Sequence, residues 1–363
     1  MKPLETDKLF EKAESFRQKS RYAEALDLYR QALKSYTSSR DLSGIMQCQL
    51  STGDVCRMIG DFERAEKAYA AAIKTARKIY DIAAIADAEI GIGLSLRAKG
   101  DWKKALDMIS SAMDYYESAG DKHGIAFSLW AKAGSLRIKG DILEAIVSFK
   151  QALKAFKSLK QESSIGYCLC GLGGTSRIAG LFKDSLNYYN QANTLFAGIK
   201  DTFGTAYSYC GIGNAHRMLG DYTRALSYFK KASALYNKIG DSVSYAYTLW
   251  SMGTTCKMLG DHTNASSYFK TSQELFKKTK DPRGLIYCWL GFGEIALIEG
   301  REKVAEKYFR ESVVNAKKYG FKVEGCHAET LFSCLPGKRK TAAGCYNKLG
   351  LRLGFGKLPF NLP

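Results

Sequence analysis

The chain has 363 residues and carries 54 lysines and arginines against 36 aspartates and glutamates, which gives a net charge of +18. This balance favours acidic partners, whether nucleic acid, anionic membrane or acidic peptide, although charge also serves solubility alone. No run approaches the roughly 18 apolar residues that a membrane span needs, and the charged stretch 1–10 lacks the apolar core of a secretory signal. We therefore expect a cytoplasmic protein without a membrane span.

The chemistry-bearing residues form no recognisable catalytic or metal-binding constellation. Most of the ten cysteines fall at apolar or interface positions of expected helices, which is typical of reduced, buried thiols in a cytosolic protein. Cys326, Cys334 and Cys345 lack the short paired spacing of a zinc site. The four histidines stand beside no nucleophile and acid arrangement. The sequence thus predicts no enzyme activity, no metal and no cofactor.

A 40-residue period organises the chain. A turn glycine is followed five positions later by a small residue and, four positions further on, by a large apolar one. The turn glycines are Gly60, Gly100, Gly140, Gly180, Gly220, Gly260 and Gly300. Such a regular period indicates a stacked array, in which each repeat contacts only its neighbours, so one solenoid accounts for the length of the chain.

The first repeat, from about residue 4, is atypical because Ser20-Arg21 replaces the Gly-Asp turn, as expected of a terminal cap. Seven further repeats fill residues 41–320. Each is predicted to have a first helix, at about 43–58 and every 40 residues thereafter, and a second helix, at about 61–78 and every 40 residues thereafter. Aspartates that precede these helices, such as Asp61, are expected to cap them.

Residues 321–363 depart from the period. We expect a helix over 323–335, a basic turn over 335–340 and a short capping helix over 341–349. The apolar segment 351–363 is punctuated by glycine and proline. We predict that it packs on the last repeat and covers its open face, because a terminal repeat needs its apolar face covered. The alternative is a mobile segment that meets a partner.

The repeat resembles the tetratricopeptide repeat. The resemblance is carried by Gly213 in the first helix and by Ala225, Phe229 and Ala232 in the second. It covers about residues 4–320, with a period of 40 rather than 34 and without the usual proline between repeats. In this respect it is most similar to the longer-helix class of the Pins-type adaptors.

The resemblance implies an all-α fold, a right-handed solenoid of about eight helical hairpins. The repeat array would occupy residues 1–320, and residues 321–363 would form a C-terminal capping segment. It also implies a concave groove lined by the first helices, a scaffold or adaptor role, and the binding of a protein or peptide.

A ladder of basic residues recurs four positions after the small residue of the first helix. Its rungs are Arg17, Arg57, Arg97, Arg137, Arg177, Arg217 and Lys257. Positions three, seven and ten residues before the rungs share the same helical face, since offsets of 0, 3, 7 and 10 fall within about 80° of one another. These positions hold aromatic, small and polar residues, among them Trp130, Trp250, Asn214, Tyr167, Tyr207 and Tyr247. Tyr287 continues the aromatic series in the eighth repeat, which lacks a basic rung.

We interpret this face as a groove for an extended acidic or phosphorylated segment of another protein. Arginine forms bidentate bonds to carboxylate and phosphate, and tyrosine and tryptophan are typical of binding hot spots. The candidate ligand-binding residues are Arg57, Arg97, Arg137, Arg177, Arg217, Lys257, Tyr167, Tyr207, Tyr247, Tyr287, Trp130, Trp250 and Asn214.

Several alternatives stay open at this point. Five of the basic rungs can instead pair with an aspartate four residues later, as in Arg217 and Asp221, and brace the turn, whereas Arg17 and Arg177 have no aspartate at that position. The aromatic stripe can serve helix packing alone. The same face also suits single-stranded nucleic acid, through base stacking and basic contacts to the backbone. A third interpretation is a regulatory subunit of a separately encoded enzyme.

Overall fold

The computed structural model describes residues 3–337 and 342–363, and within these ranges it contains eighteen helices and no strand. The first helices of the eight hairpins are α1 (Pro3–Gln18), α3 (Leu42–Met58), α5 (Ile82–Ala98), α7 (Lys122–Lys139), α9 (Glu162–Ile178), α11 (Thr202–Met218), α13 (Ser242–Met258) and α15 (Pro282–Ile298). The second helices are α2 (Tyr22–Ser39), α4 (Phe62–Lys78), α6 (Trp102–Ala119), α8 (Ile142–Ser158), α10 (Phe182–Gly198), α12 (Tyr222–Ile239), α14 (His262–Thr279) and α16 (Glu302–Tyr319). The predicted all-α repeat solenoid is confirmed.

The local rules of the repeat explain these boundaries. Asp41 accepts a hydrogen bond from the backbone N–H of Gly44 at 2.9 Å and caps α3, and Asp61 caps α4 through the N–H of Arg64 at 3.2 Å. The turn between these helices passes through Gly60, whose φ of +85° suits glycine. The expected aspartate caps are therefore present at these helix starts.

Small residues let the helices approach closely. A Cβ on Gly213 in α11 would lie 2.7 Å from the ring of Phe229 in α12, and the Phe229 side chain is fully buried. The glycine thus gives the ring of the second helix room to lie against the first helix, which offsets the cost of glycine in a helix interior. This pairing repeats along the coil and builds its core.

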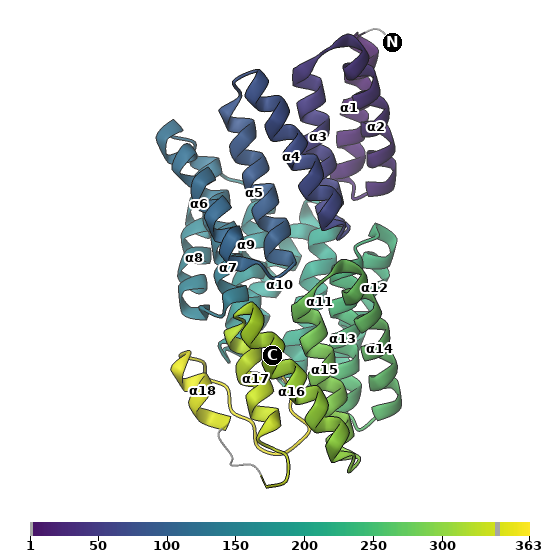
Figure 1. Ribbon diagram of the computed structural model, residues 1–363, viewed down its shortest axis with the longest axis vertical. Helices are drawn as coiled ribbons and strands as arrows, with labels where there is room; N and C mark the ends of the chain where they lie inside the picture. Colours follow the sequence, from purple (N-terminus) through teal and green to yellow (C-terminus); the bar gives the residue numbers. More distant parts are fainter. Residues whose placement is uncertain (1–2, 338–341) are drawn as a thin grey trace.

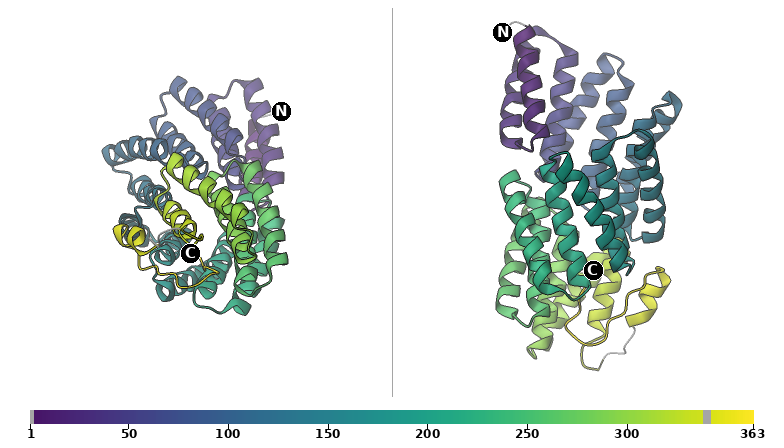
Figure 2. Two further views of the ribbon diagram at one scale, coloured as in Figure 1. Left: turned by 60° about the horizontal axis from the view of Figure 1, so that its bottom comes forward. Right: turned by 180° about the vertical axis from the view of Figure 1, so that it is seen from behind.

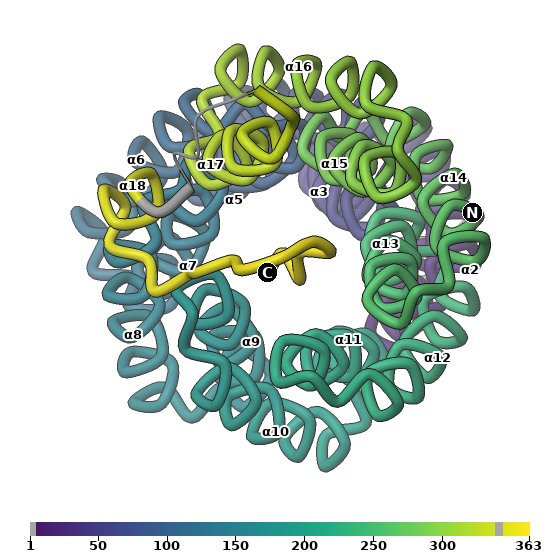
Figure 3. Tube along the Cα trace, turned by 90° about the horizontal axis from the view of Figure 1, so that it is seen from below, coloured from purple at the N-terminus to yellow at the C-terminus, as the bar shows by residue number. Residues whose placement is uncertain are grey.

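Seen along its axis, the coil of hairpins has the outline of a ring, in which the first helices line the inside and the second helices form the outside (Figure 3). Figures 1 and 2 show that the coil continues past one turn, so that its last repeats lie against early ones. At this seam the Trp102 indole N–H donates to the carbonyl of Tyr319 at 2.8 Å, and Lys322 pairs with Asp141 at 2.5 Å. The first helices therefore enclose a channel.

Two helices follow the repeats, α17 (Lys322–Phe332) and α18 (Ala342–Lys348). They correspond to the helices expected over 323–335 and 341–349, both somewhat shorter than predicted. The predicted basic turn over 335–340 lies partly outside the described residues. Among the residues that the structure describes, no helix combines the length and the apolar character needed to cross a membrane.

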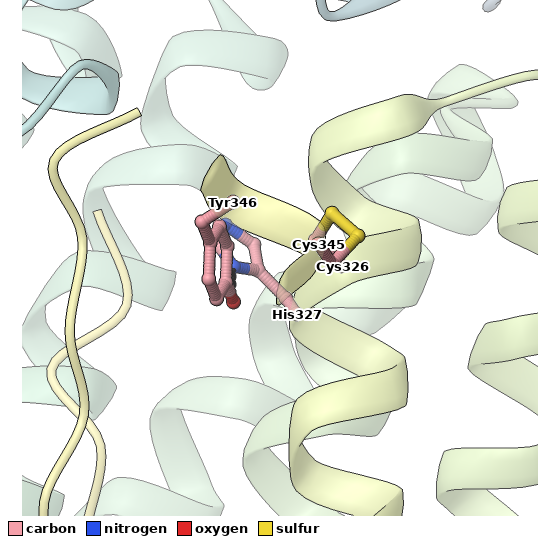
Figure 4. Close-up of a disulfide and its surroundings, with 4 residues drawn as sticks. All are labelled: Cys326, His327, Cys345 and Tyr346. Carbon is pink, nitrogen blue, oxygen red and sulfur yellow. Dashed lines mark hydrogen bonds between the residues drawn. A yellow bond between two sulfur atoms is a disulfide. The ribbon is translucent and has the colours of Figure 1, made fainter. Parts of the chain in front are cut away.

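A disulfide joins Cys326 of α17 to Cys345 of α18, beside the hydrogen-bonded side chains of His327 and Tyr346 (Figure 4). The expectation of reduced cysteines is wrong for this pair, because the chain folds back after α17 and brings the two residues together. Six other cysteines are buried thiols, as expected: Cys48, Cys56, Cys168, Cys170, Cys256 and Cys288.

Residues 351–363, which we call the tail, cross the ring and enter the channel (Figure 3). Leu351 and Leu353 pack with Ile178 of α9, and the N–H of Arg352 donates to the carbonyl of Ala179 at 3.0 Å. The tail also packs with the C-terminal helices: Leu351 and Leu353 share a cluster with Val323 of α17, and Phe360 and Leu362 belong to a cluster formed with α15–α17. The tail thus packs on the last repeat, as predicted, and in addition it contacts the fifth repeat and spans the channel, which was not predicted.

Candidate binding channel

The basic ladder stands on the last turn of the first helices, which line the channel. Arg17 and Arg57 line a cavity of about 630 Å³ at the N-terminal end of the channel, together with Glu14 and Asp54. Arg137 and Arg177 line a smaller cavity of about 140 Å³ further along. The ladder residues thus face the enclosed space.

The turn aspartates do not pair with the ladder. Asp221 accepts from the backbone N–H of Arg224 at 3.1 Å, and its carboxylate lies 3.3 Å from the Arg224 Nε. Within the described ranges, no rung forms a salt bridge with the aspartate four residues later. Bracing of the turn is therefore not the role of Arg217 here.

The rungs at the two ends of the ladder are neutralised by acidic residues. Arg17 pairs with Glu14 at 2.6 Å, and Arg57 lies 3.6 Å from Asp54. At the other end Lys257 pairs with Glu294, and both side chains are almost completely buried, at 2% and 0% exposure. These rungs therefore have a carboxylate partner inside the protein.

Three of the rungs, Arg97, Arg137 and Lys257, face a position 37 residues later, on the next first helix. For Lys257 this position holds its partner Glu294. For Arg97 it holds Gly134, where a Cβ would lie 2.1 Å from Nη1 of the arginine, and for Arg137 it holds Gly174, at 3.2 Å from Nη1. The guanidinium groups thus occupy space that a side chain would fill, and no carboxylate is placed there.

The three middle rungs, Arg97, Arg137 and Arg177, form the group that we call the arginine arc. Among the described residues none of the three has a salt-bridge or hydrogen-bond partner, although Arg97 lies over the ring of Trp130 at 5.5 Å. Nε of Arg137 and both Nε and Nη1 of Arg177 are buried without a partner. Buried polar groups normally have a partner, so this arc is equipped to accept an anion.

Burial sets the electrostatics of the arc. It lowers the pKa of Arg97 to about 9, with the positive charges of Arg137 and Arg57 adding to the shift. Burial also lowers the pKa of Arg177, and Arg137 contributes there as well. Like charges are thus held near one another in a poorly solvated place, and an anion bound among them would relieve both effects.

The next rung, Arg217, is fully buried and contacts the tail. Its Nη2 donates to Oδ1 of Asn214 at 3.1 Å, and its Nη1 donates to Oδ1 of Asn361. The Asn361 amide donates in turn to the carbonyl of Arg217 at 2.7 Å. Lys257 donates to the carbonyl of Phe360 at 2.9 Å. Both rungs therefore already hold an extended segment.

The predicted aromatic residues contribute to packing. The Tyr167 hydroxyl donates to Asp201 at 3.0 Å, and the Tyr247 ring packs on Phe276 at 4.7 Å. The Tyr287 hydroxyl donates to Glu324 at 2.9 Å, and the Trp250 indole N–H donates to the Tyr287 carbonyl at 3.2 Å. Tyr207, Tyr247, Tyr287, Trp250 and Asn214 also line the small cavity beside Arg137 and Arg177.

Sequence reasoning missed two parts of this surface. Glu294 was not a candidate, although an acid at its repeat position, 37 residues after Lys257, was the available signal. Residues 360 and 361 were assigned to a cap, and no pattern placed them in the channel. Across the residues that the structure describes, no three histidine, cysteine or acidic side chains gather in a metal-binding cluster.

Comparisons with known proteins agree with this architecture. A search of curated proteins gave no match. Among solved structures, a Rap protein complexed with competence and sporulation factor is similar, with a TM-score of 0.67 and 14% identity over 95% of this chain and 96% of the other. The Rap conjugation gene regulator of plasmid pLS20, in complex with the Phr* peptide, has a TM-score of 0.60 and 15% identity over 95% and 93%.

A third similar structure is aspartyl phosphate phosphatase F from Bacillus subtilis, with a TM-score of 0.56 and 16% identity over 82% of this chain and 76% of the other. At these identities the likeness shows a shared fold. The family model for the tetratricopeptide repeat matches residues 6–78, 84–158 and 166–238, which is more than half of the sequence. The chain belongs to the tetratricopeptide repeat family.

Proposed function

We propose that this protein is a non-catalytic scaffold that captures an extended acidic or phosphorylated segment of another protein in its channel. The arginine arc would provide the anion contacts. The observation that carries the proposal is the charge balance along the ladder: rungs at both ends have acidic partners, and the four consecutive rungs between them have none. Arg217 is held by Asn214 and Asn361, which leaves the three rungs of the arginine arc without a polar partner. A guanidinium group is a planar fork that matches carboxylate and phosphate geometry.

The spacing of the arc suggests the pattern of the ligand. Neighbouring packed helices lie about 8–10 Å apart, so successive rungs have a similar separation at their roots. In an extended chain, residues two or three positions apart are separated by about 7 or 10 Å. A segment with acidic or phosphorylated residues two or three positions apart would therefore place one anion near each of Arg97, Arg137 and Arg177.

The structural neighbours support the class of ligand. One Rap protein was solved with competence and sporulation factor and another with the Phr* peptide. Single-stranded nucleic acid is the less favoured ligand, because Tyr167, Tyr247 and Tyr287 are engaged in packing and hydrogen bonds rather than left as stacking platforms.

The test measures anisotropy of fluorescein-labelled deca-glutamate at physiological salt. Changing Arg137→Ala and Arg177→Ala together should weaken binding at least tenfold, since each anion–guanidinium contact is worth about 1.5–3 kcal/mol. The melting temperature should stay the same or rise, because the two half-buried guanidinium groups have no internal partner to lose. The matched control is Lys150→Ala with Lys230→Ala, which removes the same charge from exposed sites on the outer helices α8 and α12.

The control should bind within twofold of the native chain. Equal loss in both double variants would show that binding follows net charge, and the proposed groove would be wrong. A collapse of melting temperature in the arc variant would assign the arginines to folding. Tighter binding of a deca-thymidine oligonucleotide, with the same dependence on Arg137 and Arg177, would favour nucleic acid instead.

A further inference from the structure

The channel wall holds the tail backbone at one residue. The N–H of Phe360 donates to Oε1 of Glu294, and its carbonyl accepts from Nζ of Lys257 at 2.9 Å. Glu294 and Lys257 also pair with each other in an almost fully buried position. Both contacts reach backbone atoms, so this clamp recognises an extended backbone with a free N–H and is indifferent to the side chain.

A second clamp recognises a side-chain amide. Asn361 accepts from Nη1 of Arg217 through its oxygen and donates to the Arg217 carbonyl through its nitrogen at 2.7 Å. Asn214 fixes Arg217 from the other side at 3.1 Å. An aspartate at the tail position would lack the donor, and a smaller residue would lack both contacts. The site therefore selects asparagine.

The residue before the asparagine fills an apolar site. Phe360 is 4% exposed and belongs to a cluster with Leu290, Phe309 and Leu331. Its ring stacks on Phe355 at 5.0 Å. Clamp and cluster together accept a large apolar residue followed by asparagine, in an extended conformation.

The tail follows the ladder in reverse order. Phe360 meets Lys257 on α13, Asn361 meets Arg217 on α11, and Pro363 lines the small cavity with Arg177 on α9 and Arg137 on α7. From Phe360 to Pro363 the tail thus moves toward earlier repeats. A segment that lies in the same way would place its residues from about two positions after the asparagine at the arginine arc.

The tail fills its side of the channel incompletely. A cavity of about 340 Å³ lies between residues 352–361 and the channel wall, where Met218 and Met258 line it. Arg352, Gly354 and Lys357 of the tail are exposed. Apart from the backbone hydrogen bond of Arg352 to Ala179, its polar contacts with the wall lie at Phe360 and Asn361, so that one local set of contacts holds the end of the tail.

We propose that these clamps are a second subsite of the channel, for a partner segment of the pattern large apolar–Asn–x–acidic, and that the tail occupies it as an internal ligand. The inference rests on the proposed function, because it takes the same acidic segment onward from the arginine arc to this subsite. Since the tail is tethered, its effective concentration is high, and a partner gains access to the subsite only by displacing it.

The probe is a fluorescein-labelled peptide, Leu-Pro-Phe-Asn-Leu-Glu-Ala-Glu-Ala-Glu, tested against the full chain and its Asn361→Ala variant. The variant should bind the peptide at least tenfold more tightly than the native chain, because its internal competitor is weakened. A peptide with alanine in place of asparagine should bind the variant at least tenfold more weakly. The control Lys357→Ala, an exposed tail residue, should behave as the native chain does.

Equal binding of the two peptides to the Asn361→Ala variant would overturn the subsite, and equal affinity of native and variant chains would overturn the competition. Hydrogen exchange on the native chain gives an answer without any variant: saturating peptide should deprotect the amide of Phe360, and unchanged protection would contradict displacement. Failure of the arginine arc itself would appear separately, as deca-glutamate binding that does not depend on Arg137 and Arg177.

Discussion

The pair Lys257 and Glu294 offers the sharpest test of how the channel wall is held together. Both side chains are almost completely buried, and Glu294 also accepts from the N–H of Phe360. Burial lowers the pKa of Lys257, although the Glu294 carboxylate opposes the shift. Changing Glu294→Gln would remove that compensation and leave the ammonium in a poorly solvated site. Breaking one side of a buried pair costs about 3–5 kcal/mol.

A double variant distinguishes the effect of losing the whole ion pair from the effect of losing one of its charges. Lys257→Met with Glu294→Leu removes both charges, and replacing a buried pair by apolar residues is often neutral or stabilising by about 1–4 kcal/mol. Here the gain is opposed, because the N–H and carbonyl of Phe360 lose their partners, at about 1–3 kcal/mol for each unsatisfied group. We expect the double variant to be close to the native chain and clearly more stable than the single variant.

The assay is thermal unfolding followed by circular dichroism. Unfolding entropy of about 2.1 cal/mol/K per residue, over the whole chain, converts a loss of about 4 kcal/mol into a decrease in Tm of about 5 °C. Repeat arrays can open in parts, so hydrogen exchange of α13 and α15 provides the local readout. A Glu294→Gln variant that melts within 1 °C of the native chain, or a double variant that melts below the single one, would refute the reasoning.

Two further predictions concern the C-terminal helices. The disulfide between Cys326 and Cys345 closes a loop with a sequence separation of 19. Because the bond restricts the unfolded chain, Cys326→Ser should lower the free energy of unfolding of this region by about 3 kcal/mol. Faster hydrogen exchange in α17 and α18 would measure the loss. His327 is fully buried beside Tyr346, and burial lowers its pKa to about 4. As the pH falls, the unfolded chain therefore takes up the proton before the folded chain does. The free energy of unfolding should be at its full value above about pH 6.5 and should decrease by about 1.4 kcal/mol per pH unit down to about pH 4. Thermal melts of the native chain between pH 7.5 and 4.5 should show this decrease, and those of His327→Gln should not.

A specific result would contradict each of these two predictions. Treatment of the native chain with a thiol reductant should reproduce the exchange rates of Cys326→Ser, and a reduced native chain that stays as protected as the oxidised one would remove the disulfide from the stability of this region. For His327, parallel pH profiles in the native chain and the glutamine variant would show that this histidine does not control the acid side.

The repeat architecture could be predicted from the sequence because its determinants are local. Asp61 caps its own helix three residues away, and Gly213 meets Phe229 within one hairpin. Forty-residue copies of these short-range contacts determine helix bounds, helix pairing and the inward-facing side of each first helix. The finer resemblance to Pins-type adaptors stays a prediction.

The charge balance of the channel could not be predicted because it depends on contacts between repeats. Arg97 and Lys257 occupy equivalent positions, yet one faces Gly134 and the other faces Glu294, each 37 residues later. Which position faces a rung becomes evident only when neighbouring hairpins are stacked. The disulfide was missed for a related reason, since the spacing of cysteines does not determine their pairing.

The tail shows most clearly where sequence reasoning ends. Its apolar residues predict that it is buried, but they do not indicate which surface it packs against. An extended chain of this length reaches about 45 Å, which is enough for either an end cap or a path through the channel. Polar contacts decide between them: the backbone of Phe360 meets Lys257 and Glu294, and Asn361 meets Arg217. The tail thus supplies polar partners to Lys257, Glu294 and Arg217. Beyond Pro363 the rungs Arg177 and Arg137 have none, and there the same requirement for a partner can be met by the anions of another chain.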